Sequence, residues 1–70
     1  MRRNHNRSMM ITVHEADAHA FFPVTVTFES GSEWYGTVRT LEEVWALAKE
    51  HKLRMRDVLF RGRSRLDIAR

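Results

Sequence analysis

The sequence contains no cysteine and only one proline and three glycines. The absence of thiols excludes disulfides, thiolate-bound zinc and a cysteine nucleophile. No apolar run approaches the ~20 residues of a membrane span, and the basic N-terminus is not followed by the apolar segment of a signal peptide. We therefore predict a cytoplasmic protein with no membrane partner, held together by packing alone.

The residues that catalysis requires are also scarce. No serine lies in a G-x-S-x-G pattern, and the glycines form neither a phosphate-binding loop nor a dinucleotide fingerprint. Glu42 and Glu43 are adjacent, so on a helix they point in different directions and do not form a pair for acid–base chemistry. These observations predict a protein that is not an enzyme and has no cofactor.

One segment is rich in potential metal ligands. Residues 14–19 read His-Glu-Ala-Asp-Ala-His, which places four ligand types within six positions. The second histidine follows the first by five residues, so the spacing is not that of the H-E-x-x-H motif. A polar connection between two strands explains the segment better, and we predict no metal site.

What the chain does contain is enough apolar sequence for one small core. Seventy residues, 43% of them hydrophobic, predict a single domain rather than a disordered chain. Residues 1–8 are polar and patternless, and residues 63–70 are arginine-rich with isolated apolar positions, which fit a frayed or short helical tail. We predict a disordered basic arm over 1–8, one α+β domain over 9–62 and a basic tail over 63–70.

Alternating apolar positions predict three strands. Residues 9–14, 21–29 and 34–40 each place apolar side chains on every second position, and Ser30-Gly31-Ser32 predicts a hairpin turn between the last two. Pro23 cannot donate to a ladder, so its strand should start there or lie at an edge. We expect the large aromatic side chains to form the core: Phe22, Phe28, Trp34 and Trp45.

The clearest helix signal begins at Thr40. Thr40 and Glu43 have capping-box spacing, with the Glu43 carboxylate expected on the Thr40 amide, and helical spacing continues to about His51. The apolar stripe consists of Leu41, Val44, Trp45 and Ala48. The predicted fold is α+β: a three-stranded antiparallel meander packed by this helix, with a short second helix or strand near the C-terminus. Residues 53–62 fit both, and we favour the helix.

Charge is unevenly distributed along the chain. Residues 1–8 carry +3, residues 9–48 carry −5 and residues 49–70 carry +5, which sum to the formal net charge of +3. Arginine guanidinium groups bind phosphates and release counterions from nucleic acids. The candidate binding residues are therefore Lys49, Lys52, Arg54, Arg56, Arg61, Arg63 and Arg65, together with Arg39 and Tyr35 on the sheet.

Ala48, Leu53 and Val58 stand at positions where two packed helices need apolar residues, so the segment from Leu47 to Val58 loosely resembles helix-turn-helix and ribbon-helix-helix patterns. Lys52 stands where the turn usually has glycine, and Arg61 stands where a recognition helix has an apolar residue. Two strands also precede the segment, which a ribbon-helix-helix protein lacks, so neither family is assigned.

The sequence thus predicts a small binding protein that docks through its C-terminal arginine cluster on nucleic acid or a nucleoprotein complex. The alternative is a phage- or mobile-element-type inhibitor or adaptor that binds a host protein complex, for example a defence complex, by charge complementarity. A homodimer formed through an exposed strand edge is a further expectation.

Overall fold

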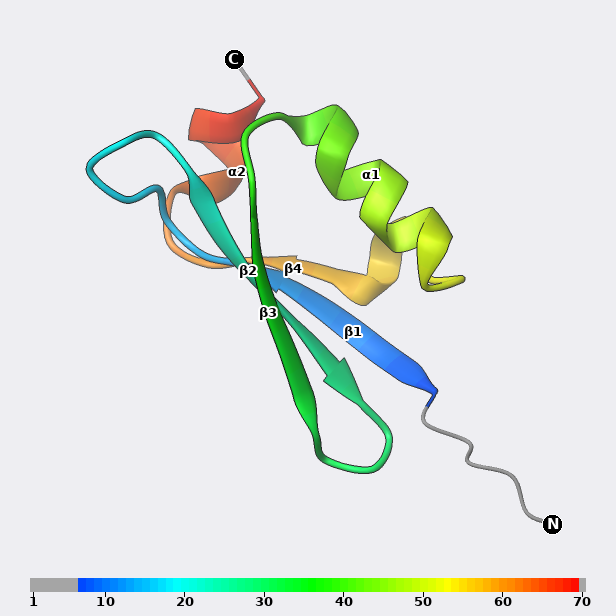
Figure 1. Cartoon of the computed structure of the whole chain (residues 1–70). Helices are drawn as coiled ribbons and strands as arrows, with labels where there is room; N and C mark the ends of the chain where they lie inside the picture. The colour runs from blue at the N-terminus through cyan, green and yellow to red at the C-terminus, as the bar shows by residue number, and fades with distance from the viewer. Residues whose placement is uncertain (1–6, 70) are drawn as a thin grey trace, which may run out of the picture.

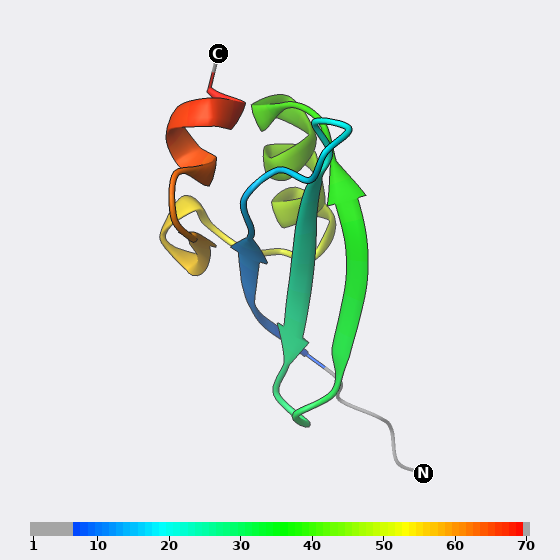
Figure 2. The same ribbon diagram turned by 90° about the vertical axis from the view of Figure 1, so that its left-hand side faces the viewer.

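The computed structural model describes residues 7–69 as a four-stranded sheet covered on one face by two helices (Figure 1, Figure 2). The sheet order is β3-β2-β1-β4. In chain order the elements are β1 (Ser8–Val13), β2 (Phe22–Phe28), β3 (Glu33–Val38), α1 (Leu41–Glu50), the 3-10 turn η1 (Met55–Asp57), β4 (Val58–Phe60) and α2 (Ser64–Ile68). The predicted α+β class is confirmed.

The predicted meander is present, but the sheet has a fourth strand, which we expected only as the alternative to a short second helix and not as part of the sheet. β1 pairs antiparallel with β2, and β2 pairs antiparallel with β3. β4 pairs parallel with β1, with Ile11 opposite Val58 and Val13 opposite Phe60. A three-residue strand is too short to show alternation, and parallel pairing requires a long crossover, which here runs through α1. The prediction of a purely antiparallel, three-stranded sheet was therefore incomplete.

Pro23 is the second residue of β2, which lies inside the sheet rather than at its edge. The carbonyl of Pro23 accepts from the His14 amide at 2.8 Å, just beyond the end of β1. The missing N–H of Pro23 therefore faces the end of the β1–β2 ladder, where it removes little pairing. The strand starts at Phe22, one residue before the predicted start, and the edge alternative is wrong.

α1 has the predicted position and apolar stripe. Thr40 is the N-cap, and its hydroxyl accepts from the Glu43 amide at 3.2 Å. The Glu43 carboxylate accepts from the Arg39 amide at 2.6 Å rather than from the predicted Thr40 amide. Val44 and Ala48 are buried, and they pack in one core with strand residues Ile11, Val13, Phe22, Val24, Val26 and Val38.

Trp34 does not belong to this core, contrary to the prediction. Its side chain is 46% exposed, and its ring folds over Gly36, where an added Cβ would lie 2.4 Å from the indole. β3 is an edge strand, and the centroid of the His51 ring at the end of α1 is 6.5 Å from that of Trp34, so the indole is only partly covered. Of the other aromatic residues predicted in the core, Phe22 is buried, whereas Phe28 and Trp45 are partly buried.

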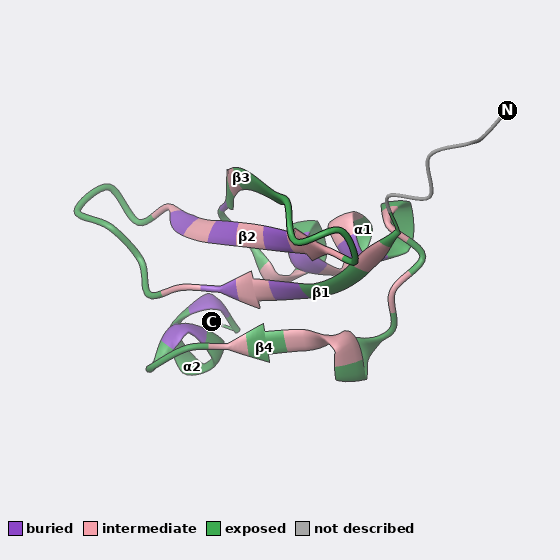
Figure 3. Ribbon diagram, turned by 90° about the horizontal axis from the view of Figure 1, so that it is seen from below, coloured by how far each residue is buried: buried purple, intermediate pink, exposed green. Residues whose placement is uncertain are grey.

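The opposite face of the sheet is not covered by either helix (Figure 3). The strand register places Leu59, Thr12, Thr25 and Tyr35 in one row across the four strands on this face. Leu59 and Tyr35 are exposed, at 45% and 68%. We call this surface the open face.

The C-terminal residues are part of the folded unit. Over residues 53–62 the chain forms η1 and then β4, so the favoured helix is wrong and the strand alternative describes Val58–Phe60. The segment predicted as a basic tail contains α2, and Ile68 is only 5% exposed within the core. The predicted N-terminal arm lies largely outside the described residues, apart from Arg7 and Ser8.

Candidate functional site

Seven basic side chains follow one another from the end of α1 to the first turn of α2. We call them the basic run: Lys49, Lys52, Arg54, Arg56, Arg61, Arg63 and Arg65. All seven are exposed, and none forms an ion pair with an acidic side chain of residues 7–69. Because only Glu50 and Asp57 add negative charge within this stretch, the run carries a surplus of positive charge.

The first half of the basic run is shaped by the end of α1. The Leu53 amide donates to the Ala48 carbonyl at 2.8 Å and the Lys52 amide to the Lys49 carbonyl at 3.0 Å, which is the Schellman motif. Lys52 occupies the left-handed position of this motif with φ 59°, where glycine is the usual residue. The chain therefore places a positive charge at a position where a side chain costs backbone strain.

η1 turns the chain towards β4 with its own cap. The Arg54 amide donates to the Asp57 carboxylate at 2.9 Å, and the Asp57 amide donates to the Arg54 carbonyl at 2.9 Å. These bonds use only the backbone of Arg54. The guanidinium groups of Arg54 and Arg56 remain exposed beside β4.

The second half of the run is tied to the end of β1. The Val13 carbonyl accepts from the Arg61 amide at 2.8 Å and from the Ser64 hydroxyl at 3.0 Å. Ser64 is fully buried, and its hydroxyl is satisfied by this bond. Glu15 accepts from the Arg63 amide at 2.8 Å, so a carboxylate from the β1–β2 connection holds the β4–α2 loop.

Gly62 makes this contact possible. Its φ is +58°, and a Cβ at this position would lie 1.8 Å from the Glu15 carboxylate. Glu15 therefore lies directly on the loop backbone. Because that carboxylate bonds the Arg63 amide and not its guanidinium, the Arg63 charge stays available.

Arg65 differs from the rest of the run because its guanidinium lies 5.2 Å from the Phe60 ring centroid. Phe60 also packs edge-on against Trp45, with centroids 6.1 Å apart. Such a cation–π contact orients the side chain while leaving its charge exposed. Arg65 therefore links the run to the aromatic residues that join β4 to α1.

Arg39 and Tyr35 lie at the other edge of the sheet, so the structure does not bring them to the basic run. Arg39 lies 5.1 Å above the Phe21 ring. The Tyr35 hydroxyl donates to Glu33, and this hydrogen bond, followed by the charge of Glu33, raises the pKa of Tyr35 above its ordinary value. β2 and β1 separate these two residues from β4.

The polar residues 14–19 have separate structural roles. His14 bonds the Thr25 hydroxyl at 3.0 Å, and Glu15 caps the β4–α2 loop. Asp17 accepts from the Phe21 and His19 amides, which lowers the pKa of its carboxyl group. Among residues 7–69, no three histidine, aspartate or glutamate side chains come together as a metal site.

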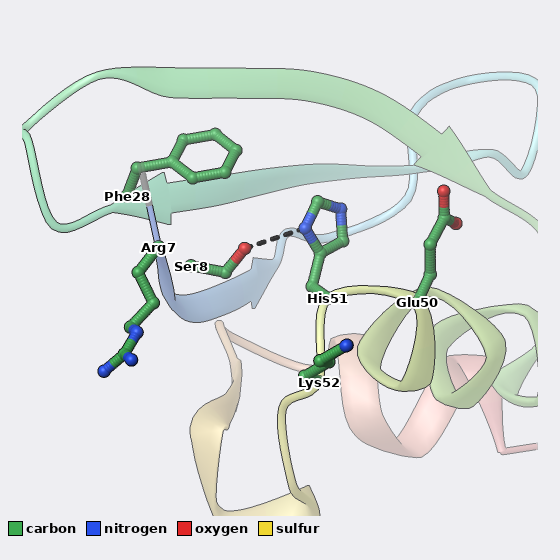
Figure 4. Close-up of a pocket in the computed structure, with 6 residues that line it drawn as sticks. All are labelled: Arg7, Ser8, Phe28, Glu50, His51 and Lys52. Atoms are coloured by element: carbon green, nitrogen blue, oxygen red, sulfur yellow. Dashed lines mark hydrogen bonds between the residues drawn. The ribbon is translucent and has the colours of Figure 1, made fainter. Parts of the chain in front are cut away.

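Two hollows border the basic run. One has a volume of about 540 Å³ and is lined by Arg7, Ser8, Phe28, Glu50, His51 and Lys52. In Figure 4 the Ser8 hydroxyl faces the His51 ring, with a hydrogen bond of 2.8 Å, and the Arg7 guanidinium points away from it. The second has about 320 Å³ and is lined by Trp45, Ala48, Lys49, Leu53 and Met55.

Sequence reasoning missed the residues that shape these hollows. His51 ends α1 and was visible only as a helix terminus, while Ser8 was assigned to the N-terminal arm. Their contact joins residues 43 positions apart, which no local pattern predicts. Met55, which lines the second hollow, is 64% exposed.

No protein-family model, curated protein or solved structure matches this chain. Within residues 7–69, neither helix has the length and apolar character needed to cross a bilayer.

Proposed function

We propose that this protein is a small non-enzymatic binding protein that docks on nucleic acid, alone or within a nucleoprotein complex, through the basic run. One observation carries the proposal: seven exposed cationic side chains follow one another from the end of α1, past β4, to α2 without an ion pair to any acidic side chain of residues 7–69. Uncompensated arginines and lysines are the groups that replace counterions on phosphates.

The backbone of Lys52 supports the proposal. A non-glycine residue in the left-handed region costs about 1–2 kcal/mol, and such strain is concentrated at functional positions. Lys52 adds its charge to the run from that conformation. A favourable interaction with the C-terminal end of the α1 dipole offsets part of the cost, about 0.3–1 kcal/mol.

The loop contacts give a second line of support. The backbone of the β4–α2 loop is held to β1 by Glu15, Ser64 and the Arg61 amide, while the arginine side chains are not used. A backbone that is already held in place loses little conformational entropy on binding, so the ordering cost is confined to the side chains. The run is therefore suited to a polyanionic partner.

The proposal is tested by fluorescence anisotropy with labelled single-stranded and double-stranded oligonucleotides over a salt series. Binding by the intact protein should weaken steeply as salt rises. In the double variant Arg56→Gln/Arg63→Gln, the slope of log affinity against log salt should fall by about 1.8 on duplex or 1.4 on single strands, if each arginine contacts one phosphate. Neither guanidinium makes a described contact, so folding should be unaffected.

The matched control is Arg7→Gln/Arg39→Gln, which removes the same charge from outside the run. We expect this control to retain most of the affinity. Equal losses of affinity in the two double variants would show that binding depends only on net charge. The absence of a complex at low salt would refute nucleic-acid docking.

A protein partner is the second candidate, favoured by the apolar side chains beside the run. Met55 and Leu66 are 64% and 66% exposed, and Met55 borders the hollow formed with Trp45. Mixed apolar and basic surfaces are common in protein interfaces, as expected for an inhibitor or adaptor that docks on an acidic protein surface. Affinity purification from the host, with and without nuclease treatment, separates the nucleic-acid candidate from the protein candidate. A protein that still copurifies after the nucleic acid is digested, and that no longer copurifies with the variant Met55→Ser/Leu66→Ser, supports a protein partner.

A further inference from the structure

The outer edge of β3 offers unused backbone hydrogen-bonding groups. The Phe28 amide donates to the Ser32 carbonyl at 3.0 Å, which sets the phase of the β2–β3 ladder. Because bonding alternates along an antiparallel pair, Trp34, Gly36 and Val38 bond to β2. The N–H and C=O groups of Glu33, Tyr35 and Thr37 therefore point away from the sheet. Figures 1 and 2 show no helix or strand of the described chain beyond β3.

This edge has few of the features that prevent strand pairing. β3 is six residues long, contains no proline or lysine, and has Glu33 as its one charged residue. Exposed edges of this kind pair readily with another strand. The opposite edge, β4, has only three residues and is flanked by the arginines of the basic run.

We propose that β3 pairs antiparallel with β3 of a second copy of this chain, with Tyr35 opposite Tyr35 across a two-fold axis. In this register Glu33 lies opposite Thr37 of the second copy, so the two glutamates are kept apart. The outward groups of Glu33, Tyr35 and Thr37 then form six hydrogen bonds, two per facing pair. The two sheets join into one of eight strands.

The side chains of β3 favour a second copy over an unrelated peptide. On the helix side, Trp34 would lie opposite Gly36 of the second copy in a non-hydrogen-bonded pair, where side chains are closest. The missing Cβ of Gly36 accommodates the indole of its own chain, so in this register the Trp34 rings of the two copies come to lie beside each other. Pairing would thus cover Trp34, which is 46% exposed in the single chain. On the open face the two Tyr35 rings become an aromatic cross-strand pair.

The test is sedimentation velocity from micromolar to millimolar protein with Thr37→Pro and Thr37→Val. Proline removes the outward N–H of Thr37 without touching the β2 ladder and is tolerated at an edge, whereas valine keeps the N–H and the β-branched shape. We expect the natural chain and Thr37→Val to shift from monomer to dimer, and Thr37→Pro to remain a monomer with an unchanged circular dichroism spectrum.

Amide hydrogen exchange on the natural chain decides the question even if the proline variant does not fold. The Tyr35 and Thr37 amides should exchange more slowly as protein concentration rises. A monomer at every concentration, or exchange at these amides that does not depend on concentration, would overturn the proposal. A dimer that persists in folded Thr37→Pro would place the interface elsewhere and would overturn it as well.

Discussion

Replacing Gly62 by alanine should destabilise the protein by removing the contact between Glu15 and the β4–α2 loop. Alanine at φ +58° costs about 1–2 kcal/mol, and the lower entropy of the unfolded chain offsets about 0.4–1 kcal/mol of this. The new Cβ also displaces the carboxylate from the Arg63 amide, at about 0.5–1.5 kcal/mol for the lost hydrogen bond. Because the Glu15 side chain is exposed and can rotate away from the new Cβ, the clash costs no more than the free energy of the lost hydrogen bond. The expected net loss is about 1–2 kcal/mol.

Thermal denaturation followed by circular dichroism measures this loss. In a domain of this size, 1 kcal/mol corresponds to about 4–8 °C in Tm, so Gly62→Ala should lower Tm by about 5–15 °C. Glu15→Ala alone removes the same hydrogen bond, and the double variant should be little less stable than Gly62→Ala. Additive effects, within the usual ~0.3–0.5 kcal/mol, would show that Glu15 does not lie on Gly62 and would refute the reasoning.

Two further predictions concern protonation. Tyr35 is the single tyrosine, so phenolate absorbance reports on its titration alone. Glu33→Gln should lower the pKa of Tyr35, because it weakens the hydrogen bond and removes the charge that raise this pKa. An unchanged titration would contradict the Tyr35–Glu33 hydrogen bond. The lowered pKa of Asp17 means that its contribution to stability is present above the unfolded value of 3.8 and is lost as pH falls through the lower folded value. The His19 and Phe21 amides should therefore change their NMR shifts only below about pH 3.8, and a transition above that value would argue against these bonds.

The elements that the sequence predicted well are those with agreeing local signals. α1 combines an N-cap at Thr40 with an apolar stripe at helical spacing, and both lie within a dozen residues. The β2–β3 hairpin likewise has alternation on both sides of a turn in which Gly31 adopts a positive φ of 95°. Local propensity and burial favour the same structure in these segments, so the prediction does not depend on distant contacts.

The elements that were missed depend on distant contacts. β4 exists as a strand because Val58–Phe60 pairs with β1, far away in sequence, and its own three residues carry no periodic signal. Trp34 was assigned to the core because its strand alternates correctly. Its exposure follows from the position of β3 at the sheet edge, which only the strand order determines.

In the candidate site, too, the features that depend on single residues were predictable and those that depend on distant contacts were not. The exposed charges of the basic run were visible in the sequence because arginine and lysine are rarely buried unless paired. Their arrangement was not visible, since it depends on Glu15 reaching Arg63 across 48 positions and on the Schellman motif at Lys52. Arg39 and Tyr35 were grouped with the run by residue type, whereas the sheet order separates them from it.

The two proposed interactions use opposite edges of one sheet, and this separation makes them independently testable. Nucleic-acid docking depends on charges beside β4, while self-pairing depends on backbone groups of β3, with β1 and β2 between them. Thr37→Pro should therefore abolish dimerisation and leave the intrinsic affinity of each basic run unchanged, whereas Arg56→Gln/Arg63→Gln should weaken binding and leave the sedimentation behaviour unchanged. A dimer would carry two basic runs at the outer ends of its joined sheet, so on long nucleic acid its apparent affinity should exceed that of the monomer. If both variants changed both properties, one surface would serve both interactions, and the division of the sheet into two working edges would be wrong.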